Sequence, residues 1–264
     1  MRIQFRLFPQ ARKRALTFSY DDGTVHDRRL VGMFNRYGVR ATFHLNSGML
    51  DQPGWIRSSE VASLYENHEV SVHTIHHYHL ERIPPDMAAS EILDDRRALE
   101  ALVGYPVRGM SFPFGTFNDD LVRLLPTLGI EYARTVRETH LLEVPGNFHR
   151  WDTTCHHNHD LLAQGERFLK EDSPQPVLMV VWGHSWDFDH DDNWVLMEEF
   201  CRLTGGKDDI WYATCMEIAE YITAVRRLRF SVVKDRVYNP SSLPVWIEVD
   251  SRQVMVPPGQ TLPL

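Results

Sequence analysis

Residues 15–23 of this chain have the sequence ALTFSYDDG, and the rest of the chain is organised around them. The first six residues mix apolar, β-branched and aromatic side chains, which is typical of a buried strand. The strand ends in Asp21, Asp22 and Gly23, and an Asp-Gly pair favours a turn because glycine adopts positive φ. Adjacent carboxylates repel each other, so a metal ion on one and a proton-acceptor role for the other would explain the pair. A solvated turn is the alternative interpretation.

Strand-like and helix-like segments alternate along the chain. Strands are predicted at 15–20, 39–45, 69–72, 108–112, 132–136, 177–182 and 210–213. Helices are predicted at 27–37, 87–102, 159–170, 194–203 and 216–228, with shorter ones after 58–60 and 118–120. This alternation predicts an α/β fold in which helices surround a parallel sheet or barrel.

The C-terminal segment, residues 232–264, has a different pattern. Two β-like runs at 244–249 and 252–256 predict a hairpin that is appended to the barrel. Because no linker separates a second domain, we expect a single domain over residues 1–264.

Composition and charge argue against several classes of protein. The chain has 264 residues, of which 43% are hydrophobic, and a formal net charge of −8. The negative charge argues against a nucleic-acid partner and against a basic membrane-binding face. No apolar run of about 18 residues is present, and the first residues lack the apolar core of a signal peptide. The three cysteines are few and odd in number, which suits a reducing cytosol. Together, these observations predict a cytoplasmic protein that does not bind a membrane.

Two histidines, His73 and His77, follow the predicted strand 69–72. On a helical turn, residues four apart share one face, so both imidazoles could bind one ion. Together with a carboxylate from another strand end, they would leave positions open for water and substrate, as in a catalytic zinc site. The same ligands suit non-haem Fe(II), so they do not identify the metal. A histidine-rich polar loop is the alternative.

Two other segments with possible chemistry also follow predicted strands, and barrel enzymes place their active sites at such strand ends. His184 ends an apolar run, where the pKa of an imidazole can be tuned to near neutral, although a structural histidine bonded to a backbone carbonyl is equally compatible. Residues 112–115, FPFG, predict a tight turn that could direct a backbone N–H into the site as an oxyanion donor.

Five segments together resemble the polysaccharide deacetylases, which are carbohydrate esterase family 4 or the NodB homology type. Residues 19–23, SYDDG, resemble the TFDDG motif of that family, and residues 73–77, HTIHH, resemble its H-[ST]-x-x-H motif. Residues 111–115 are similar to its RxPYG turn, 182–184 to its final Leu-x-His, and 39–43 to its ATF strand. The motifs occur in the family order within residues 15–184, and the resemblance implies a distorted (β/α) barrel of about seven strands.

The resemblance also implies a role for each matching residue. One divalent metal is expected on Asp22, His73 and His77, with zinc the first choice and cobalt, nickel, manganese or iron as alternatives. Asp21 would be the general base for the attacking water, and His184 the proton donor to the leaving group. The backbone N–H of Phe114 would stabilise the oxyanion.

Several positions depart from the family pattern or have no assigned role in it. The third motif of the family carries an arginine that pairs with the base, and Ser111 occupies that position here. Arg150 could supply the charge from another loop, with Asp152 orienting His184, although a surface ion pair is the favoured interpretation. Trp186 could form a sugar-stacking wall or belong to the core.

Two polar clusters are typical of loops. Residues 155–159, CHHNH, could form a second metal site or line the pocket, but a polar loop with incidental histidines is favoured. The acidic residues between 187 and 192 predict a solvated loop, which could attract a cationic product such as a free amino sugar.

The leading hypothesis is a metal-dependent hydrolase that removes the acetyl group of an N-acetylated sugar or glycan precursor, with an O-acetyl group as the second choice. Its partner would be a small molecule or oligosaccharide. A cyclic-amide hydrolase of the allantoinase or imidase type is one alternative, and an inactive carbohydrate-binding barrel is another. An Fe(II) oxygenase would require an all-β jelly roll, which the alternating strands and helices contradict.

Overall fold

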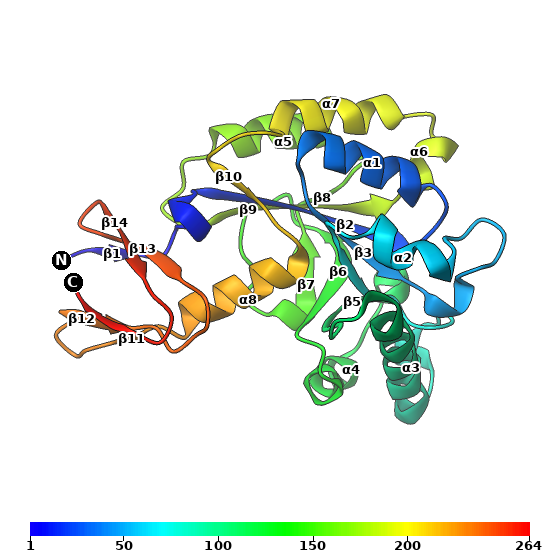
Figure 1. The fold of residues 1–264 in the computed structure, drawn as a ribbon, viewed down its shortest axis with the longest axis horizontal. Coiled ribbons are helices and arrows are strands. Elements are labelled where there is room, and N and C mark those ends of the chain that lie inside the picture. The colour runs from blue at the N-terminus through cyan, green and yellow to red at the C-terminus, as the bar shows by residue number, and fades with distance from the viewer.

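The computed structural model describes residues 1–264, and its centre is a sheet of nine strands (Figure 1). The sheet order is β7-β6-β5-β4-β3-β2-β9-β8, all neighbours are parallel, and β10 pairs with β2. The strands are β2 Arg14–Asp22, β3 Ala41–Leu45, β4 Glu69–Val72, β5 Gly109–Ser111, β6 Tyr132–Glu138, β7 Trp151–Thr153, β8 Cys155–His156, β9 Val177–His184 and β10 Ile210–Tyr212.

A single residue, Thr154, closes this sheet into a distorted barrel. It connects β7 and β8, which stand at opposite ends of the sheet order. Its N–H donates to the carbonyl of Val180 at 2.9 Å, and its Oγ1 accepts the N–H of Val180 at 3.0 Å. If β7 and β8 are counted as one interrupted strand, the sheet has eight strands including β10, one more than the resemblance implies. The prediction of an α/β distorted barrel is nevertheless confirmed.

Helices cover the outside of the barrel. They are α1 Asp27–Tyr37, α2 Val61–Leu64, α3 Pro85–Val103, α4 Asp119–Leu124, α5 Leu161–Lys170, α6 Asp187–His190, α7 Trp194–Thr204 and α8 Cys215–Arg226. In Figure 1, α1, α5 and α7 lie above the long strands β2 and β9, whereas α3 and α4 lie on the opposite side. No helix is both long and apolar enough to cross a bilayer.

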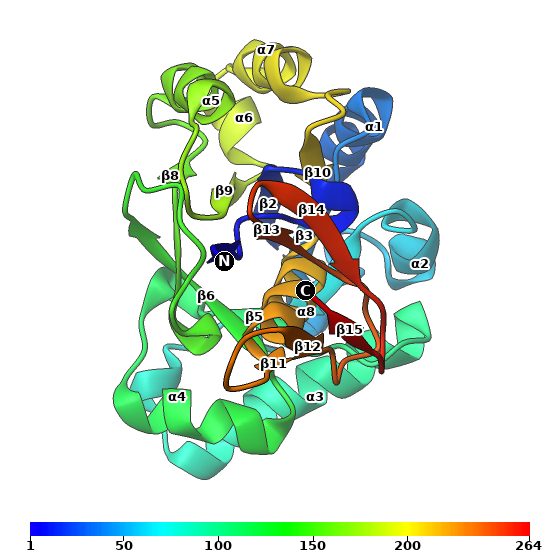
Figure 2. The same cartoon turned by 90° about the vertical axis from the view of Figure 1, so that its left-hand side faces the viewer.

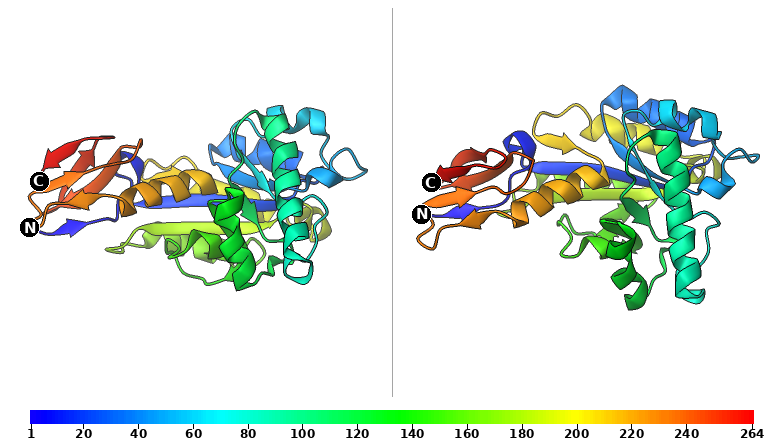
Figure 3. Two further views of the ribbon diagram at one scale, coloured as in Figure 1. Left: turned by 90° about the horizontal axis from the view of Figure 1, so that it is seen from below. Right: turned by 60° about the horizontal axis from the view of Figure 1, so that its bottom comes forward.

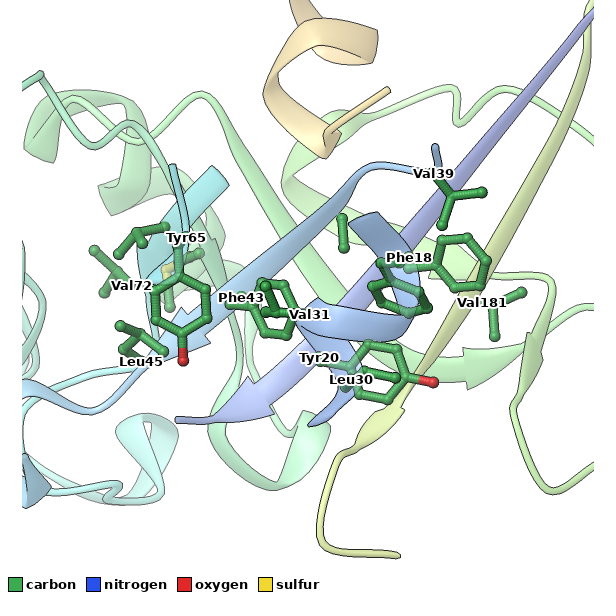
Figure 4. Close-up of a cluster of buried hydrophobic side chains, with 14 of the residues drawn as sticks. Phe18, Tyr20, Leu30, Val31, Val39, Phe43, Leu45, Tyr65, Val72 and Val181 are labelled. Carbon is green, nitrogen blue, oxygen red and sulfur yellow. The ribbon is translucent and has the colours of Figure 1, made fainter. Parts of the chain in front are cut away.

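Strand β2 divides the interior into an apolar layer and a polar layer. Phe18 and Tyr20 pack outward against α1 and β3 (Figure 4). The ring centroids of Phe18 and Phe34 are 4.5 Å apart. Burying an aromatic side chain of this size stabilises the fold by about 1.5–3 kcal/mol. The alternate residues Ser19 and Asp21 point to the other face, because successive side chains of a strand alternate. The barrel lumen is therefore lined by polar groups.

Helix α8 closes the amino-terminal end of the barrel. The N–H of Met216 in its first turn donates to the buried carboxylate of Glu69 at 2.9 Å, and the hydroxyl of Tyr132 donates to the same carboxylate at 2.7 Å. Because an N-terminal helix end favours negative charge, Glu69 and α8 stabilise each other.

The predicted C-terminal hairpin is present as β13 Val245–Val249 and β14 Arg252–Val256, and β1 Ile3–Gln4 adds to it as a third antiparallel strand. A second small sheet contains β11 Arg229–Phe230, β12 Arg236–Tyr238 and β15 Thr261–Pro263. Figures 2 and 3 show both sheets at the end of the barrel that also carries the two termini.

Candidate active site

A cavity of about 360 Å³ opens at the carboxyl ends of the barrel strands. Its lining contains seven residues predicted from the sequence, Asp21, Asp22, His73, His77, Phe114, His184 and Trp186, and also Phe112, Val136 and Trp182. The fold thus brings together residues that are up to 165 positions apart in the chain, from Asp21 to Trp186. Arg150 and Asp152 are not among them.

Three side chains in this cavity are spaced to hold one metal ion. Nε2 of His73 lies 3.1 Å from Nε2 of His77, and Oδ1 of Asp22 lies 3.7 and 3.8 Å from these two nitrogens. Burial lowers the pKa of His73, and burial with the charge of His73 lowers the pKa of His77 to about 4, so both rings are neutral near pH 7. Neutral imidazoles and a carboxylate are the protonation states that metal binding requires. These residues fit a divalent ion.

The backbone of Ser111 fixes which nitrogen of His73 is free. Nδ1 of His73 is 3.1 Å from the carbonyl oxygen of Ser111, which can only accept, so this nitrogen carries the proton. The lone pair is therefore on Nε2, the atom that faces Asp22 and His77. A ligating histidine normally donates its other N–H to a carbonyl or carboxylate in this way, which further supports a metal at this position.

The segment 73–77 is not helical, contrary to the expectation from its spacing. Thr74 and His77 have positive φ values of 67° and 56°, and the side-chain amide of Asn46 donates to the carbonyls of His73 and Thr74 at 2.5 and 2.8 Å. The two imidazoles therefore meet through a loop that Asn46 holds from the end of β3. The spacing of four residues predicted their proximity but not its cause.

The base candidate Asp21 is paired with Arg134, an arginine that the sequence analysis did not identify. The Arg134 guanidinium bonds both carboxylate oxygens of Asp21, and its Nε donates to Ser19 Oγ at 3.0 Å. Burial alone would raise the pKa of Asp21, but the charge of Arg134 outweighs it and holds the pKa well below its usual range. Asp21 is therefore ionised. The signal in the sequence was an arginine within the mostly apolar segment that forms the first half of β6, because a buried charge requires a partner of opposite charge.

Arg150 and Asp152 lie away from the base and the proton donor. Arg150 forms an ion pair with Asp119 at 2.5 Å, and Asp152 accepts from the hydroxyl of Thr135 at 2.6 Å. The cation that pairs with Asp21 is Arg134, which is buried and belongs to strand β6 of the barrel wall. Arg150 is exposed and forms only the surface ion pair.

The partner of the proton-donor candidate His184 is Asp187 instead of Asp152. Oδ2 of Asp187 lies 3.3 Å from Nδ1 of His184 and accepts its backbone N–H at 3.1 Å. Burial lowers the pKa of His184, but the bond to Asp187 and the charges of Asp21 and Asp22 outweigh burial, so the net shift is upward. Asp187 is buried at 8% exposure, so the acidic run 187–192 is not entirely the solvated loop that was predicted.

Two aromatic side chains border the cavity. The indole N–H of Trp186 donates to Oδ2 of Asp22 at 3.1 Å, and its ring stacks on His184 with centroids 5.0 Å apart. On the other side, Phe114 is half exposed, has a φ of 57°, and stacks on His79 at 3.8 Å. Both rings expose apolar faces beside the metal ligands.

Comparison with known proteins gives a family match for part of the chain. Residues 9–133 match the model of the polysaccharide deacetylase family. The match covers 125 of the 264 residues, and this segment is therefore similar to that family. No curated protein sequence is similar enough to the chain to count as a match.

Several solved structures share the fold of this chain at low sequence identity. A putative polysaccharide deacetylase from Mycobacterium smegmatis has a TM-score of 0.62 and 18% identity, over 83% of this chain and 93% of the other. The allantoinase PuuE has a TM-score of 0.64 and 12% identity, over 80% and 91%. A family 4 carbohydrate esterase from Streptomyces lividans, solved with acetate, has a TM-score of 0.52 and 17% identity, over 76% of this chain and 92% of the other. Two other deacetylase structures are matched over only 55% and 44% of their own length.

Proposed function

We propose that this protein is a metal-dependent hydrolase of the deacetylase family that removes the acetyl group from an N-acetylated sugar. The observation that carries the proposal is the juxtaposition of a three-ligand cluster with a buried, ionised carboxylate and an imidazole of raised pKa in one cavity. Ligands, base and acid are the parts that hydrolysis of an unactivated amide requires.

A divalent metal held by Asp22, His73 and His77 would act as a Lewis acid for the acyl oxygen and lower the pKa of water. Asp21 lies beside this cluster, with its Oδ2 4.0 Å from Nε2 of His73, and it accepts the proton of the attacking water. His184, held by Asp187, donates a proton to the departing amine. The backbone N–H of Phe114 is the proposed oxyanion donor.

The aromatic border suggests how a sugar is held. A pyranose ring has apolar C–H faces that stack on aromatic rings, and Trp186 and Phe114 offer such faces next to the ligand cluster. We propose that the substrate is a monosaccharide or short oligosaccharide with its acetamide directed at the cluster and its ring against these two residues.

Acetate release tests this proposal. Metal-reconstituted protein is incubated with N-acetylated sugars, O-acetylated sugars and allantoin, and free acetate and ring opening are measured separately. We expect acetate from an N-acetyl sugar, and loss of at least about a hundredfold in kcat for Asp21→Asn. Asp120→Asn, at an exposed carboxylate, is the matched control and should retain full activity.

Three other outcomes would replace the proposal. Ring opening of allantoin without acetate release would support a cyclic-amide hydrolase. Acetate release by Asp21→Asn at the wild-type rate would remove the base assignment. Full metal occupancy without turnover of any compound would support an inactive carbohydrate-binding barrel.

A further inference from the structure

A second histidine cluster surrounds the carboxylate that holds His184. Oδ2 of Asp187 lies 3.3 Å from Nε2 of His156 and 3.6 Å from Nε2 of His157, in addition to 3.3 Å from Nδ1 of His184. The two histidines come from β8 and the residue after it. The ligand atoms of His156, His157 and Asp187 lie within 4.8 Å of one another, so by spacing alone they could hold a metal.

The hydrogen bonds of His156 argue against metal binding. The backbone N–H of Asn158 donates to Nδ1 of His156 at 3.2 Å. A ring nitrogen that accepts an N–H carries no proton, so in a neutral imidazole the proton is on Nε2. This is the nitrogen that faces Asp187. His73 in the first cluster has the opposite tautomer, with its proton on Nδ1 and its lone pair free for an ion.

His157 is held in the same state by different contacts. Its ring is fully buried between Tyr20 and Phe188, with centroids 5.7 and 4.1 Å away. The hydroxyl of Tyr20 is 3.2 Å from Nδ1, and we infer that it donates to this nitrogen because it has no other hydrogen-bond partner. The proton of the ring is then on Nε2, which lies 3.6 Å from the carboxylate, beyond hydrogen-bond distance. Burial lowers the pKa of His157 to about 2, so the ring is neutral.

The backbone leaves no room for another arrangement of these rings. A Cβ atom at position 183 would lie 2.1 Å from Nδ1 of His157 and 3.2 Å from Nε2 of His156, so only glycine is tolerated next to them. The turn that carries His184 is therefore packed directly on the two imidazoles. Any movement of these rings would displace both His184 and the carboxylate that it contacts.

We propose that His156 and His157 are positioning residues for the proton donor, because as neutral imidazoles with protons on Nε2 they enclose the Asp187 carboxylate and keep it against His184. They do not form a second metal site. The N–H group of His156 at 3.3 Å, and the N–H dipole of His157 at 3.6 Å, stabilise the carboxylate without neutralising it, so Asp187 remains available as the acceptor for His184. The effect on turnover rests on the proposed function, whereas the protonation pattern does not.

The protonation pattern is tested directly by NMR of protein with ¹⁵N-labelled histidine, using long-range ¹H–¹⁵N correlations in apo protein and during zinc titration. Assignment uses the His156→Gln variant. We expect protonated Nε2 atoms in His156 and His157, and a response to the first equivalent of zinc that is confined to His73 and His77. Unprotonated Nε2 in His156, or binding of a second zinc that His156→Leu abolishes, would overturn the proposal even if no substrate is found.

The positioning role is tested by paired substitutions at His156, which is partly accessible and less critical for folding than His157. His156→Gln keeps an N–H donor near the position of Nε2, whereas His156→Leu removes it. We expect kcat to fall about tenfold in His156→Leu and less than about twofold in His156→Gln, with KM and zinc content unchanged in both. His190→Leu, an exposed histidine, is the control. Equal activity of both variants, or equal loss in both with normal thermal stability, would contradict the role.

Discussion

Arg134 reaches the carboxylate of Asp21 through the barrel lumen, from a strand that is four positions away from β2 in the sheet. Ser111, at the end of β5, donates to the same carboxylate at 3.0 Å. The serine at the position where the resemblance predicts an arginine is therefore part of the same contact network. Arg134 supplies the charge that Ser111 lacks, from a different strand.

Loss of Arg134 should affect both activity and stability. Arg134→Gln leaves Asp21 buried without its cation, so we expect the pKa of Asp21 to rise and the acid limb of kcat/KM to move to higher pH. Breaking a buried ion pair should also lower the free energy of unfolding by about 3–5 kcal/mol, as measured by urea denaturation at pH 7. Because the folded pKa of Asp21 is depressed, this loss should shrink as the pH falls below about 3.9, where the carboxylate is protonated in unfolded wild type.

Arg150→Gln is the matched control for this experiment. Its ion pair with Asp119 is exposed and should contribute less than about 1 kcal/mol. If the acid limb of the kcat/KM profile moves in Arg150→Gln and stays in place in Arg134→Gln, then Arg150 and not Arg134 controls the pKa of Asp21.

Asp187→Asn should change the alkaline limb of the pH profile. The bond to Asp187 contributes to the raised pKa of His184, so its removal should lower that pKa and make kcat/KM decline at lower pH than in wild type. The profile is measured between pH 5 and 9 on the acetylated substrate, in steps of about half a unit. Asp192→Asn, on the exposed loop, should leave the profile unchanged, and an identical profile in both variants would exclude Asp187 as the partner.

Ser111→Ala should separate catalysis from metal binding. The substitution removes the hydroxyl, which donates to Asp21 at 3.0 Å and lies 2.7 Å from Nδ1 of His73, but it retains the carbonyl that accepts from His73 at 3.1 Å and keeps the tautomer of that ring. We expect kcat to fall about tenfold, in line with the loss of a hydrogen bond to a charged group, while zinc affinity changes little. Zinc affinity is measured by competition with a chromophoric chelator. A large loss of affinity with normal kcat at saturating zinc would show that the hydroxyl acts on the ligand instead.

Metal removal should lower thermal stability through the ligand cluster. A ligand at a hundred times its Kd stabilises the folded state by about 2.7 kcal/mol, so chelation should lower the Tm of wild type and zinc should restore it. His77→Leu should have a Tm that zinc does not raise. His79→Leu, at the neighbouring histidine that contacts Phe114, should respond to zinc as wild type does. An unchanged zinc response in His77→Leu would remove this residue from the ligand set.

Local signals in the sequence were sufficient for most elements. Helix α1 begins and ends at the predicted residues 27 and 37, because apolar spacing marks its inner face and Gly38 adopts the left-handed conformation that ends it. The hairpin β13–β14 was also found, since alternating residues flank a turn at Asp250 and Ser251. These features depend on neighbours in the chain, which a single sequence displays.

Features that depend on distant residues were not predicted. Strands β7 and β8 have only three and two residues, β7 pairs with β6, and β8 pairs with β9. Thr154 connects the two strands and bonds to Val180 of β9, so the seam depends on contacts that are distant in the sequence. The loop at His73 requires Asn46, the charge of Arg134 is compensated by Asp21, and Asp187 is buried by histidines from another strand. The identity of the ligand residues came from family resemblance, and their convergence could not have been derived from spacing alone.

The seam at Thr154 also determines when this molecule can become functional during its synthesis. Strand β9 inserts between β2 and β8, so a nascent chain must extend past His184 before the ring can close. Until then, the half-cylinder from β2 to β7 has two open edges, and pairing of distant segments is slow. The proposed active site of a nascent chain therefore stays incomplete until β9 and His184 have been translated.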